Sequence, residues 1–249
     1  MMSLPEPQPN WALFLDFDGT LVDIAPAPGA IRPDPRLAAV LAAASASVGG
    51  ALAILSGRPI SQIDHYLAPL VLPVAGLHGM EWRAADGGIR RHPGANDDIA
   101  RIRGQLAAFV DRHPGLVLED QGSALALHYR QAPALALRCR EVVERAVAGS
   151  DELMLLPGKM VLEVKSRDRN KGVAIQCLMR YPPFRERIPV CAGDDLTDED
   201  GFAVVNALAG VSIRIGADQP TQARFHIPDV AGFLVWLQSF PRCVQARTV

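Results

Sequence analysis

The sequence predicts an α/β fold in which a mainly parallel sheet is flanked by helices, with an α+β unit inserted into it. Short apolar segments alternate with helix-like segments toward both ends of the chain, which is typical of parallel strands joined by helical crossovers. The middle of the chain shows period-two alternation, which is typical of a partly antiparallel sheet with one solvated face. With 249 residues, 49% of them hydrophobic, the chain suits one large domain with a modest insertion.

The first half of the expected core contains three buried strands with two helices between them. Each strand is a short apolar run that ends in polar or glycine-rich residues. Gly49 and Gly50 end the first helix, and Pro59 opens the second, where its missing N–H does no harm. The expected order is strand 11–15, helix 36–48, strand 51–55, helix 59–67 and strand 71–75.

The inserted unit is expected at residues 82–165, so that residues 1–81 and 166–249 form the core. It is interpreted as inserted because the strand–helix pattern resumes after it. Within it we expect two short strands around a turn at 86–88, helices 97–112 and 133–148, and strands 116–119, 124–129, 153–156 and 160–164, the last two hinged by Pro157 and Gly158. The core then continues with helix 170–181, strand 188–192, helix 197–208 and strand 211–215.

Composition and charge exclude several classes of partner. The formal net charge is −2 and no basic run occurs, which argues against nucleic acid. No apolar stretch approaches the roughly 20 residues that a membrane span needs, and the first residues lack the pattern of a secretory signal. The four cysteines show no close pairing, which indicates reduced thiols. We therefore expect a cytoplasmic protein. A monomer is the expected assembly, although the sequence does not determine it.

Two aspartates follow the first strand, in the segment LFLDFDGTL. Asp16 and Asp18 are separated by one residue, so in an extended chain they point to the same side. Two close carboxylates repel each other, and a hard divalent cation with oxygen ligands removes that repulsion. Gly19 permits a tight turn, and the Thr20 hydroxyl could bind an anionic oxygen. An ordinary Asp-Gly surface turn is the alternative, but the preceding apolar run favours a carboxylate nucleophile beside a metal.

Two further segments are expected at the same edge of the sheet, because ligands bind beyond the carboxyl ends of parallel strands. Ser56, Gly57 and Arg58 follow the second strand, where a hydroxyl and backbone N–H groups could hold phosphate oxygens. Lys171 opens a helix and could direct its ammonium group toward that edge. Each feature alone would more often be a simple turn or a solvated charge.

The segment GDDLTDED, residues 193–200, is more specific. It follows a buried strand and places Asp194, Asp195 and Asp198 within about one helical turn. Acidic residues at the start of a helix can be explained by capping and by the helix dipole. Capping uses one or two acids, whereas five acidic residues lie between positions 194 and 200. Cation binding is therefore the better explanation.

In this order, DFDGTL, SGR, NKG and GDDLTDED resemble the four motifs of the haloacid dehalogenase (HAD) superfamily of phosphotransferases. Within that superfamily, AGLHGMEW, GKMVLEVK and GDDLTDEDGF resemble segments of the trehalose-6-phosphate phosphatases. The resemblance implies a Rossmann-like HAD core with an inserted α+β cap domain that determines the substrate. Ser166 departs from the pattern, which has a proline before the NKG segment, and this affects the expected substrate more than the expected chemistry.

The resemblance also implies a mechanism, in which a sugar phosphate is hydrolysed through an aspartyl-phosphate. Asp16 would be the nucleophile, and Asp18 would protonate the departing sugar oxygen and then deprotonate the attacking water. Ser56 and Lys171 would bind the phosphoryl oxygens, on which charge is spread in the transition state.

Mg²⁺ is the cofactor that the resemblance implies. It would be held by Asp16, the backbone carbonyl of Asp18, Asp194 and a phosphate oxygen, with waters completing its octahedron. Asp195 and Asp198 would orient these ligands or hold the waters.

Sugar contacts would come from the cap and from the segment after the third strand. Lys159 and Glu163 are expected on one face of a cap strand, which could also be an ordinary solvated face. His78 and Glu81 are weaker candidates, because a histidine among glycines can be a structural hydrogen-bonding residue. Arg58 could form an ion pair between the core and the cap.

Three functions remain open from the sequence. The first is a Mg²⁺-dependent trehalose-6-phosphate phosphatase. The second is another HAD sugar phosphatase or a sugar phosphomutase, which would need cap arginines such as Arg130 or Arg138 to hold a second phosphate. The third is a non-catalytic sugar-phosphate sensor, which is disfavoured because binding alone needs neither the nucleophile Asp16 nor the acid Asp18.

Overall fold

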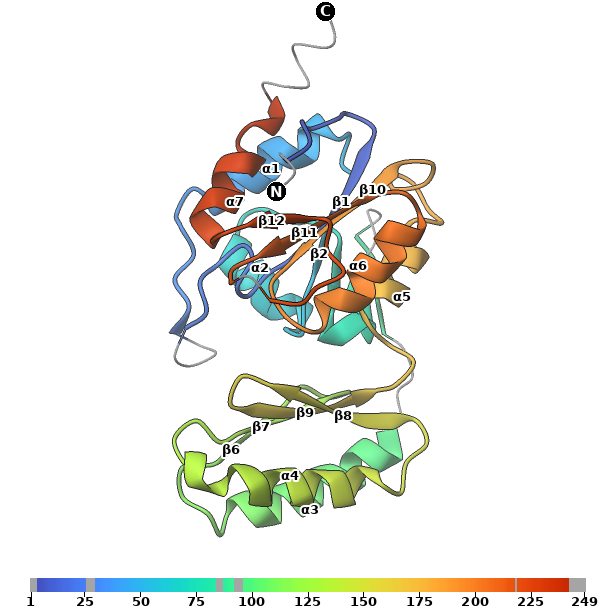
Figure 1. Cartoon of the computed structure of the whole chain (residues 1–249). Helices are drawn as coiled ribbons and strands as arrows, with labels where there is room; N and C mark the ends of the chain where they lie inside the picture. Colours follow the sequence, from blue (N-terminus) through green and yellow to red (C-terminus); the bar gives the residue numbers. More distant parts are fainter. Residues whose placement is uncertain (1–3, 26–29, 84–86, 92–95, 218, 242–249) are drawn as a thin grey trace, which may run out of the picture. The chain divides into compact units, whose positions relative to one another are not determined.

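The computed structural model describes residues 4–25, 30–83, 87–91, 96–217 and 219–241. The chain divides into two compact units, which we call the core unit (residues 1–90 and 170–249) and the inserted unit (residues 91–169). Each unit has its own cluster of buried apolar side chains. The elements of both units are labelled in Figure 1.

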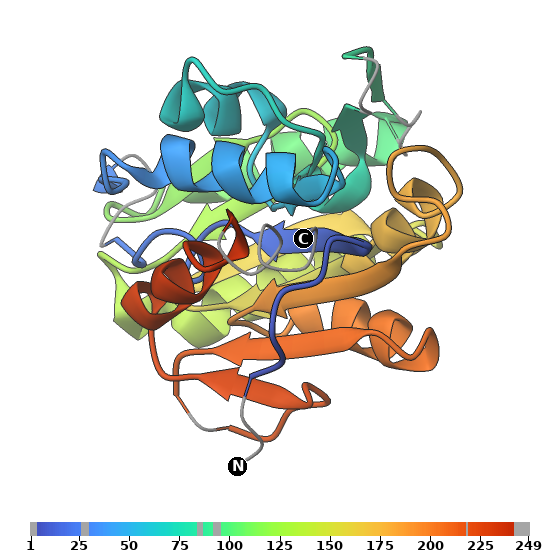
Figure 2. The same cartoon turned by 90° about the horizontal axis from the view of Figure 1, so that it is seen from above.

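Within the described residues, the core unit forms an eight-stranded sheet in the order β12-β11-β10-β1-β2-β3-β4-β5. Its strands are β1 (Trp11–Asp16), β2 (Leu52–Leu55), β3 (Val74–Gly76), β4 (Glu81–Arg83), β5 (Ile89–Arg91), β10 (Ile188–Gly193), β11 (Val211–Ile215) and β12 (Phe225–Ile227). The pairs from β12 to β3 are parallel, and β3 pairs with β4 in the antiparallel sense. Figure 2 shows β11 and β12 side by side at one edge. Because the chain continues from β1 toward both edges, the carboxyl end of β1 is a topological switch point, where α/β proteins bind ligands.

Five α-helices cover this sheet among the described residues. They are α1 (Leu37–Ser47), α2 (Ile60–Leu67), α5 (Lys171–Leu178), α6 (Asp198–Ala207) and α7 (Val230–Leu237). In Figure 1, α1 and α7 lie together on one side of the strands and α5 and α6 lie together on the other.

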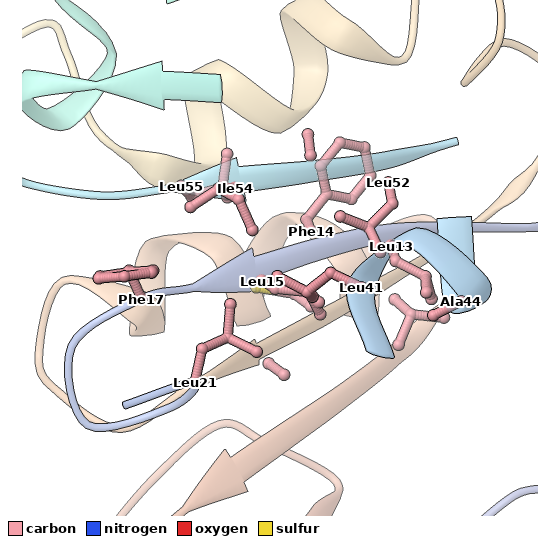
Figure 3. Packing of buried hydrophobic residues seen from close by; sticks show 14 of the residues in the cluster. Leu13, Phe14, Leu15, Phe17, Leu21, Leu41, Ala44, Leu52, Ile54 and Leu55 are labelled. Atoms are coloured by element: carbon pink, nitrogen blue, oxygen red, sulfur yellow. The ribbon is translucent and has the colours of Figure 1, made fainter. Parts of the chain in front are cut away.

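The side chains of β1 alternate between these two helical layers. Figure 3 shows Leu13 and Leu15 beside Leu41 and Ala44 of α1. Phe14 points the other way and stacks on the ring of Phe184, with the ring centroids 5.4 Å apart. Because side chains two residues apart share a face of a strand, Asp16 lies on the same face as Phe14.

The described residues of the inserted unit form a four-stranded antiparallel sheet in the order β6-β7-β9-β8. Its elements are α3 (Asn96–Val110), β6 (Val117–Asp120), β7 (Leu125–His128), the 3₁₀ turn η3 (Pro133–Leu135), α4 (Ala136–Val147), β8 (Leu153–Gly158) and β9 (Val161–Ser166). Leu125 and Leu127 of β7 are buried with Leu162 and Val164 of β9 in the cluster formed with α3 and α4. The alternate residues, including Glu163, occupy the opposite face of the sheet.

The α/β architecture with a mainly parallel sheet agrees with the expectation, but three details differ. The two strands expected in the inserted unit, β4 and β5, extend the core sheet instead, because a short 3₁₀ turn at Leu77–Gly79 folds β4 back onto β3. β8 does not hinge at Pro157 and Gly158 but continues through them, paired with β9. A proline fits there because β8 is an edge strand of its sheet. The elements β12 and α7 were not predicted, and residue 86 of the expected turn lies outside the described residues.

The structure bears on two expectations, those about membrane-spanning segments and about the cysteine thiols. In the described ranges, none of the helices combines the length and the apolar character that crossing a bilayer requires. Cys139, Cys177 and Cys191 are free thiols, and Cys243 lies outside the described residues.

Candidate active site

Strand register brings three of the expected segments to one edge of the core sheet. Asp16 is the last residue of β1, and its partner in β2 is Leu55, so Ser56 lies one residue beyond that pair. On the other side of β1, Leu15 pairs with Ala192, so Asp194 follows two residues later at the same edge. The parallel sheet therefore carries these polar residues to one place from positions far apart in the sequence.

Lys171 links Asp16 to Asp198. Its Nζ donates a hydrogen bond to Oδ1 of Asp16 and another to Oδ1 of Asp198, and both distances are 2.7 Å. The exposed fractions of the three side chains are 3% for Lys171, 7% for Asp16 and 1% for Asp198. Lys171 is the first residue of α5, whose N-cap residue Asn170 accepts the N–H of Val173 at 2.8 Å. This N-cap hydrogen bond fixes the start of α5 and therefore the position of the Lys171 backbone, from which the side chain extends.

Acidic groups crowd this buried site. Carboxylate oxygens of Asp16, Asp194 and Asp198 lie within 4.8 Å of one another, and the Lys171 ammonium contacts two of these residues. Burial raises the pKa of Asp16 well above its usual range, Lys171 opposes this rise, and Asp198 and Asp194 add to it. Burial likewise raises the pKa of Asp198 to about 7 against the effect of Lys171. A second cation would therefore relieve unfavourable charge here.

The donor set fits a hard divalent cation. Oδ2 of Asp16 is buried and has no hydrogen-bond partner among the described residues. Gly19 has a φ of +90°, and a Cβ at this position would overlap the carboxylate of Asp194. At Gly193, a Cβ would overlap the carboxylate of Asp198. The backbone thus approaches the carboxylates as closely as glycine permits, and oxygen ligands of this kind are those that Mg²⁺ prefers.

The substitution Gly19→Ala is expected to weaken both stability and cation binding. A non-glycine residue at this φ is strained by roughly 1–3 kcal/mol, and its Cβ would displace the Asp194 carboxylate. The matched control is Gly216→Ala, because Gly216 has a φ of +94° and nothing within 4 Å of an added Cβ. Thermal unfolding with and without Mg²⁺ checks the prediction: both variants should unfold earlier, and only Gly19→Ala should lose the stabilisation by Mg²⁺. Equal Mg²⁺ effects in the two variants would contradict it.

Arg58 binds Asp18 within the core unit. Its Nε and Nη2 donate to Oδ2 and Oδ1 of Asp18 at 2.6 and 2.7 Å, a bidentate ion pair. Nη1 donates to Oε1 of Gln62 at 2.9 Å, and the guanidinium lies 5.5 Å from the ring centroid of Tyr66. The backbone N–H of Arg58 donates to Oγ of Ser56 at 3.0 Å. This ion pair lies inside the core unit, because Asp18 and Arg58 follow adjacent parallel strands, and an ion pair of Arg58 with the cap stays a prediction.

The segment after β3 braces the segment after β2. The N–H of His78 donates to the carbonyl of Ser56 at 3.1 Å, and a Cβ on Gly57 would lie 2.9 Å from Nε2 of the His78 ring. Oε1 of the buried Glu81 accepts the N–H of Ile60, the first residue of α2, at 2.5 Å. Through these contacts, His78 and Glu81 stabilise the backbone of the segment after β2. A contact of either residue with a substrate stays a prediction.

Comparison with known proteins identifies the family. The family model described as trehalose-phosphatase matches residues 14–231 of the chain. The chain belongs to the trehalose-phosphatase family. It is 44% identical over 214 residues to a probable trehalose-phosphate phosphatase of Sinorhizobium fredii, covering 85% of this chain and 80% of that protein. It is 41% identical over 246 residues to the trehalose-6-phosphate phosphatase of Escherichia coli K12, covering 98% and 91% of the two chains.

A solved structure confirms the fold class. The C-terminal domain of Candida albicans trehalose-6-phosphate phosphatase superposes with a TM-score of 0.84 at 22% sequence identity, covering 94% of this chain and 93% of that chain. The expected resemblance to the trehalose-phosphatases is thereby confirmed at the level of family, and the expected architecture is confirmed at the level of fold.

Two predicted site residues of this trehalose-phosphatase core, Thr20 and Asp195, lie outside the group of Asp16, Lys171 and Asp198 that the Lys171 ammonium joins. Thr20 is fully buried, and its hydroxyl has no hydrogen-bond partner among the described residues, so its contact with an anionic oxygen stays a prediction. Asp195 is exposed, and its Oδ1 accepts the N–H and the hydroxyl of Thr197 at 2.8 and 2.6 Å. Its carboxylate thus shapes the loop before α6.

The two predicted sugar contacts lie in the inserted unit. Glu163 is in β9, where it pairs with Ala126 of β7 and Leu156 of β8. Lys159 lies in the turn between β8 and β9, and not on the strand as expected, because Met160 has a φ of +65° and turns the chain there. The two side chains therefore do not share a strand face.

Sequence reasoning missed Arg214 and Glu199 beside this site. Arg214 is a buried cation in β11, and Glu199 follows Asp198 in the first turn of α6. A usable signal existed, since an arginine within the apolar strand Val211–Ile215 has to find a partner for its charge.

Proposed function

We propose that this protein is a Mg²⁺-dependent phosphatase that hydrolyses trehalose 6-phosphate to trehalose and phosphate. The observation that carries the proposal is the buried arrangement of Asp16, Lys171 and Asp198 beside Asp194, in a member of the trehalose-phosphatase family. The 41% identity over 98% of the chain to the Escherichia coli trehalose-6-phosphate phosphatase supports this substrate. The reaction class is that of a phosphoric monoester hydrolase.

Asp16 is the proposed nucleophile. Its Oδ1 is held by the Lys171 ammonium, while Oδ2 has no hydrogen-bond partner among the described residues. One carboxylate oxygen of Asp16 would attack phosphorus in line with the departing sugar oxygen, and the other would remain available to the cation. Water then attacks the phosphorus of the aspartyl-phosphate, which releases phosphate and restores the carboxylate.

Asp18 is the proposed acid and base. It would donate a proton to the sugar oxygen in the first step and accept one from the attacking water in the second. Because Arg58 binds both carboxylate oxygens of Asp18 in this structure, that ion pair has to open or exchange before Asp18 can donate a proton. Ser56 and Lys171 would bind phosphoryl oxygens during both steps.

Asp16, Asp194 and the backbone carbonyl of Asp18 would hold the Mg²⁺ ion, with Asp198 and Asp195 positioning this set. When bound, the ion supplies positive charge that neutralises the phosphoryl oxygens. The three clustered carboxylates and the buried Oδ2 of Asp16 support this assignment.

We further propose that the inserted unit is the cap domain that selects the sugar, with Glu163 and Lys159 as contacts to its hydroxyl groups. We propose a cytoplasmic location, in line with the cysteine pattern of the sequence, and a monomeric protein.

The test is phosphate release from a panel of sugar phosphates, measured with Mg²⁺ and with EDTA. We expect kcat/KM for trehalose 6-phosphate to exceed that for glucose 6-phosphate by at least about 10²-fold, because polar groups that contact the second glucose would be left unpaired. EDTA should abolish turnover, and added Mg²⁺ should restore it. Equal rates on the two substrates would refute the proposed specificity, and full activity in EDTA would refute the metal site.

A further inference from the structure

Arg214 contacts the acidic loop from the side of β11. In the strand register, Arg214 pairs with Gly193, the residue that precedes Asp194. Its side chain is 9% exposed, and Nη1 lies 3.3 Å from the carbonyl oxygen of Asp195 and 3.4 Å from Oε1 of Glu199. The guanidinium therefore binds the loop backbone and the first turn of α6 together.

Glu199 extends this connection to a second loop. Its side chain is 16% exposed. Oε1 accepts the hydroxyl of Thr221 at 2.6 Å, and Oε2 accepts the N–H of Gln222 at 2.8 Å. We call Arg214, Glu199, Thr221 and Gln222 the clamp. It joins β11, α6 and the segment before β12.

The acidic loop, residues 193–198, is thus held from two directions. From within, Oδ2 of Asp198 accepts the N–H groups of Asp194 and Asp195 at 3.0 and 3.1 Å. From outside, Arg214 holds the carbonyl of Asp195. A loop that carries several like charges tends to open, because repulsion separates its carboxylates. The clamp opposes that separation without adding net charge, since its arginine and glutamate neutralise each other.

We propose that Arg214 and Glu199 are positioning residues that hold the acidic loop in the geometry that binds a divalent cation. This inference rests on the cation site of the proposed function. The contacts of the clamp are with the loop backbone and with residues 221–222, so its effect on the reaction is indirect. Groups that orient metal ligands commonly contribute about 10- to 100-fold to metal affinity.

The test compares the binding of Mn²⁺, followed by the paramagnetic resonance signal of the free ion, in the absence of substrate. Arg214→Ala is expected to weaken binding by about tenfold. Arg214→Lys retains a charged donor and should recover part of this loss, and Glu199→Gln should show an intermediate effect. The control is Arg224→Ala, because Arg224 is exposed and donates to the carbonyl of Asn206, away from the acidic loop. It should bind Mn²⁺ as the wild type does.

Steady-state kinetics separate positioning from a merely structural role. If the clamp positions the cation site, the Mg²⁺ concentration for half-maximal rate should rise by the same factor as the Mn²⁺ dissociation constant. At saturating Mg²⁺, the KM for the sugar phosphate should be unchanged. A general loss of folding would instead lower the rate at every Mg²⁺ concentration. Should Arg214→Ala not fold, Thr221→Val provides the comparison, since it removes one partner of Glu199 and should weaken binding about twofold.

The possible failures are distinguishable. Wild-type protein that binds no divalent cation would refute the proposed function and this inference with it. Wild-type binding together with unchanged affinity in Arg214→Ala and Arg214→Lys would refute the inference alone.

Discussion

Replacement of Asp16 by asparagine is expected to lower turnover of trehalose 6-phosphate by on the order of 10⁴-fold or more. The amide has nearly the same shape as the carboxylate, but it is a poor nucleophile toward phosphorus. The substitution should not unfold the protein. Burial raises the pKa of Asp16 against the opposing effect of Lys171, and the nearby Asp198 and Asp194 raise it further, so the ionised carboxylate is unfavourable in the folded state without a metal ion. The neutral amide removes that repulsion, and thermal stability in EDTA should equal or exceed that of the wild type.

Phosphate release and thermal unfolding in EDTA measure the two parts of this prediction. The matched control is Asp23→Asn, because Asp23 is an exposed carboxylate a few residues further along the same segment and should tolerate the change. The Asp16→Asn protein should still bind the sugar phosphate in the presence of Mg²⁺, which separates an enzyme from a sensor. Turnover that survives in Asp16→Asn would exclude the aspartyl-phosphate mechanism.

The positions of Asp16 and Asp194 could be anticipated from sequence for a physical reason. Buried parallel strands are recognisable as short apolar runs, and their carboxyl ends meet at one edge of the sheet. Any polar residue that directly follows such a run therefore lies at that edge, however far it is in sequence from the other residues there. The same reasoning placed Ser56 at this edge, and the structure has it one residue beyond the partner of Asp16.

The partners of individual side chains could not be anticipated in this way. Arg58 reaches Asp18, which follows the neighbouring strand, and Glu81 caps α2, because the exact lengths of the connecting loops decide which groups meet. Lys159 lies in a turn and not in the expected strand, because Met160 has a positive φ. The sequence does not indicate this backbone conformation. The helix α7 has the sequence VAGFLVWL, which lacks the alternation of apolar and polar residues by which surface helices are recognised.

Replacement of Lys171 by methionine should have the largest effect on stability. We expect the free energy of unfolding in EDTA to fall by about 3–5 kcal/mol, because removal of one member of a buried ion pair leaves the other uncompensated. In this protein two carboxylates, Asp16 and Asp198, lose the same ammonium group. Turnover should fall by on the order of 10²-fold or more, since the ammonium would also bind the phosphoryl group.

Denaturant unfolding in EDTA and in Mg²⁺ measures the effect. The control is Lys159→Met, because Lys159 is exposed and its replacement should change the free energy of unfolding by less than about 0.5 kcal/mol. Mg²⁺ should stabilise Lys171→Met more than it stabilises the wild type, since the ion then supplies positive charge that the lysine no longer provides.

A double variant tests whether charge is the cause. Adding Asp198→Asn to Lys171→Met removes one of the two uncompensated carboxylates and leaves the volume of the side chain nearly unchanged. Burial raises the pKa of Asp198 to about 7, so its charge is already unfavourable in the folded state. The double variant should therefore be more stable in EDTA than Lys171→Met alone, although its turnover should not recover. If the second substitution lowered stability further, the hydrogen bonds from Asp194 and Asp195 to Asp198 would outweigh its charge, and lost hydrogen bonding would have to explain the effect of Lys171 as well.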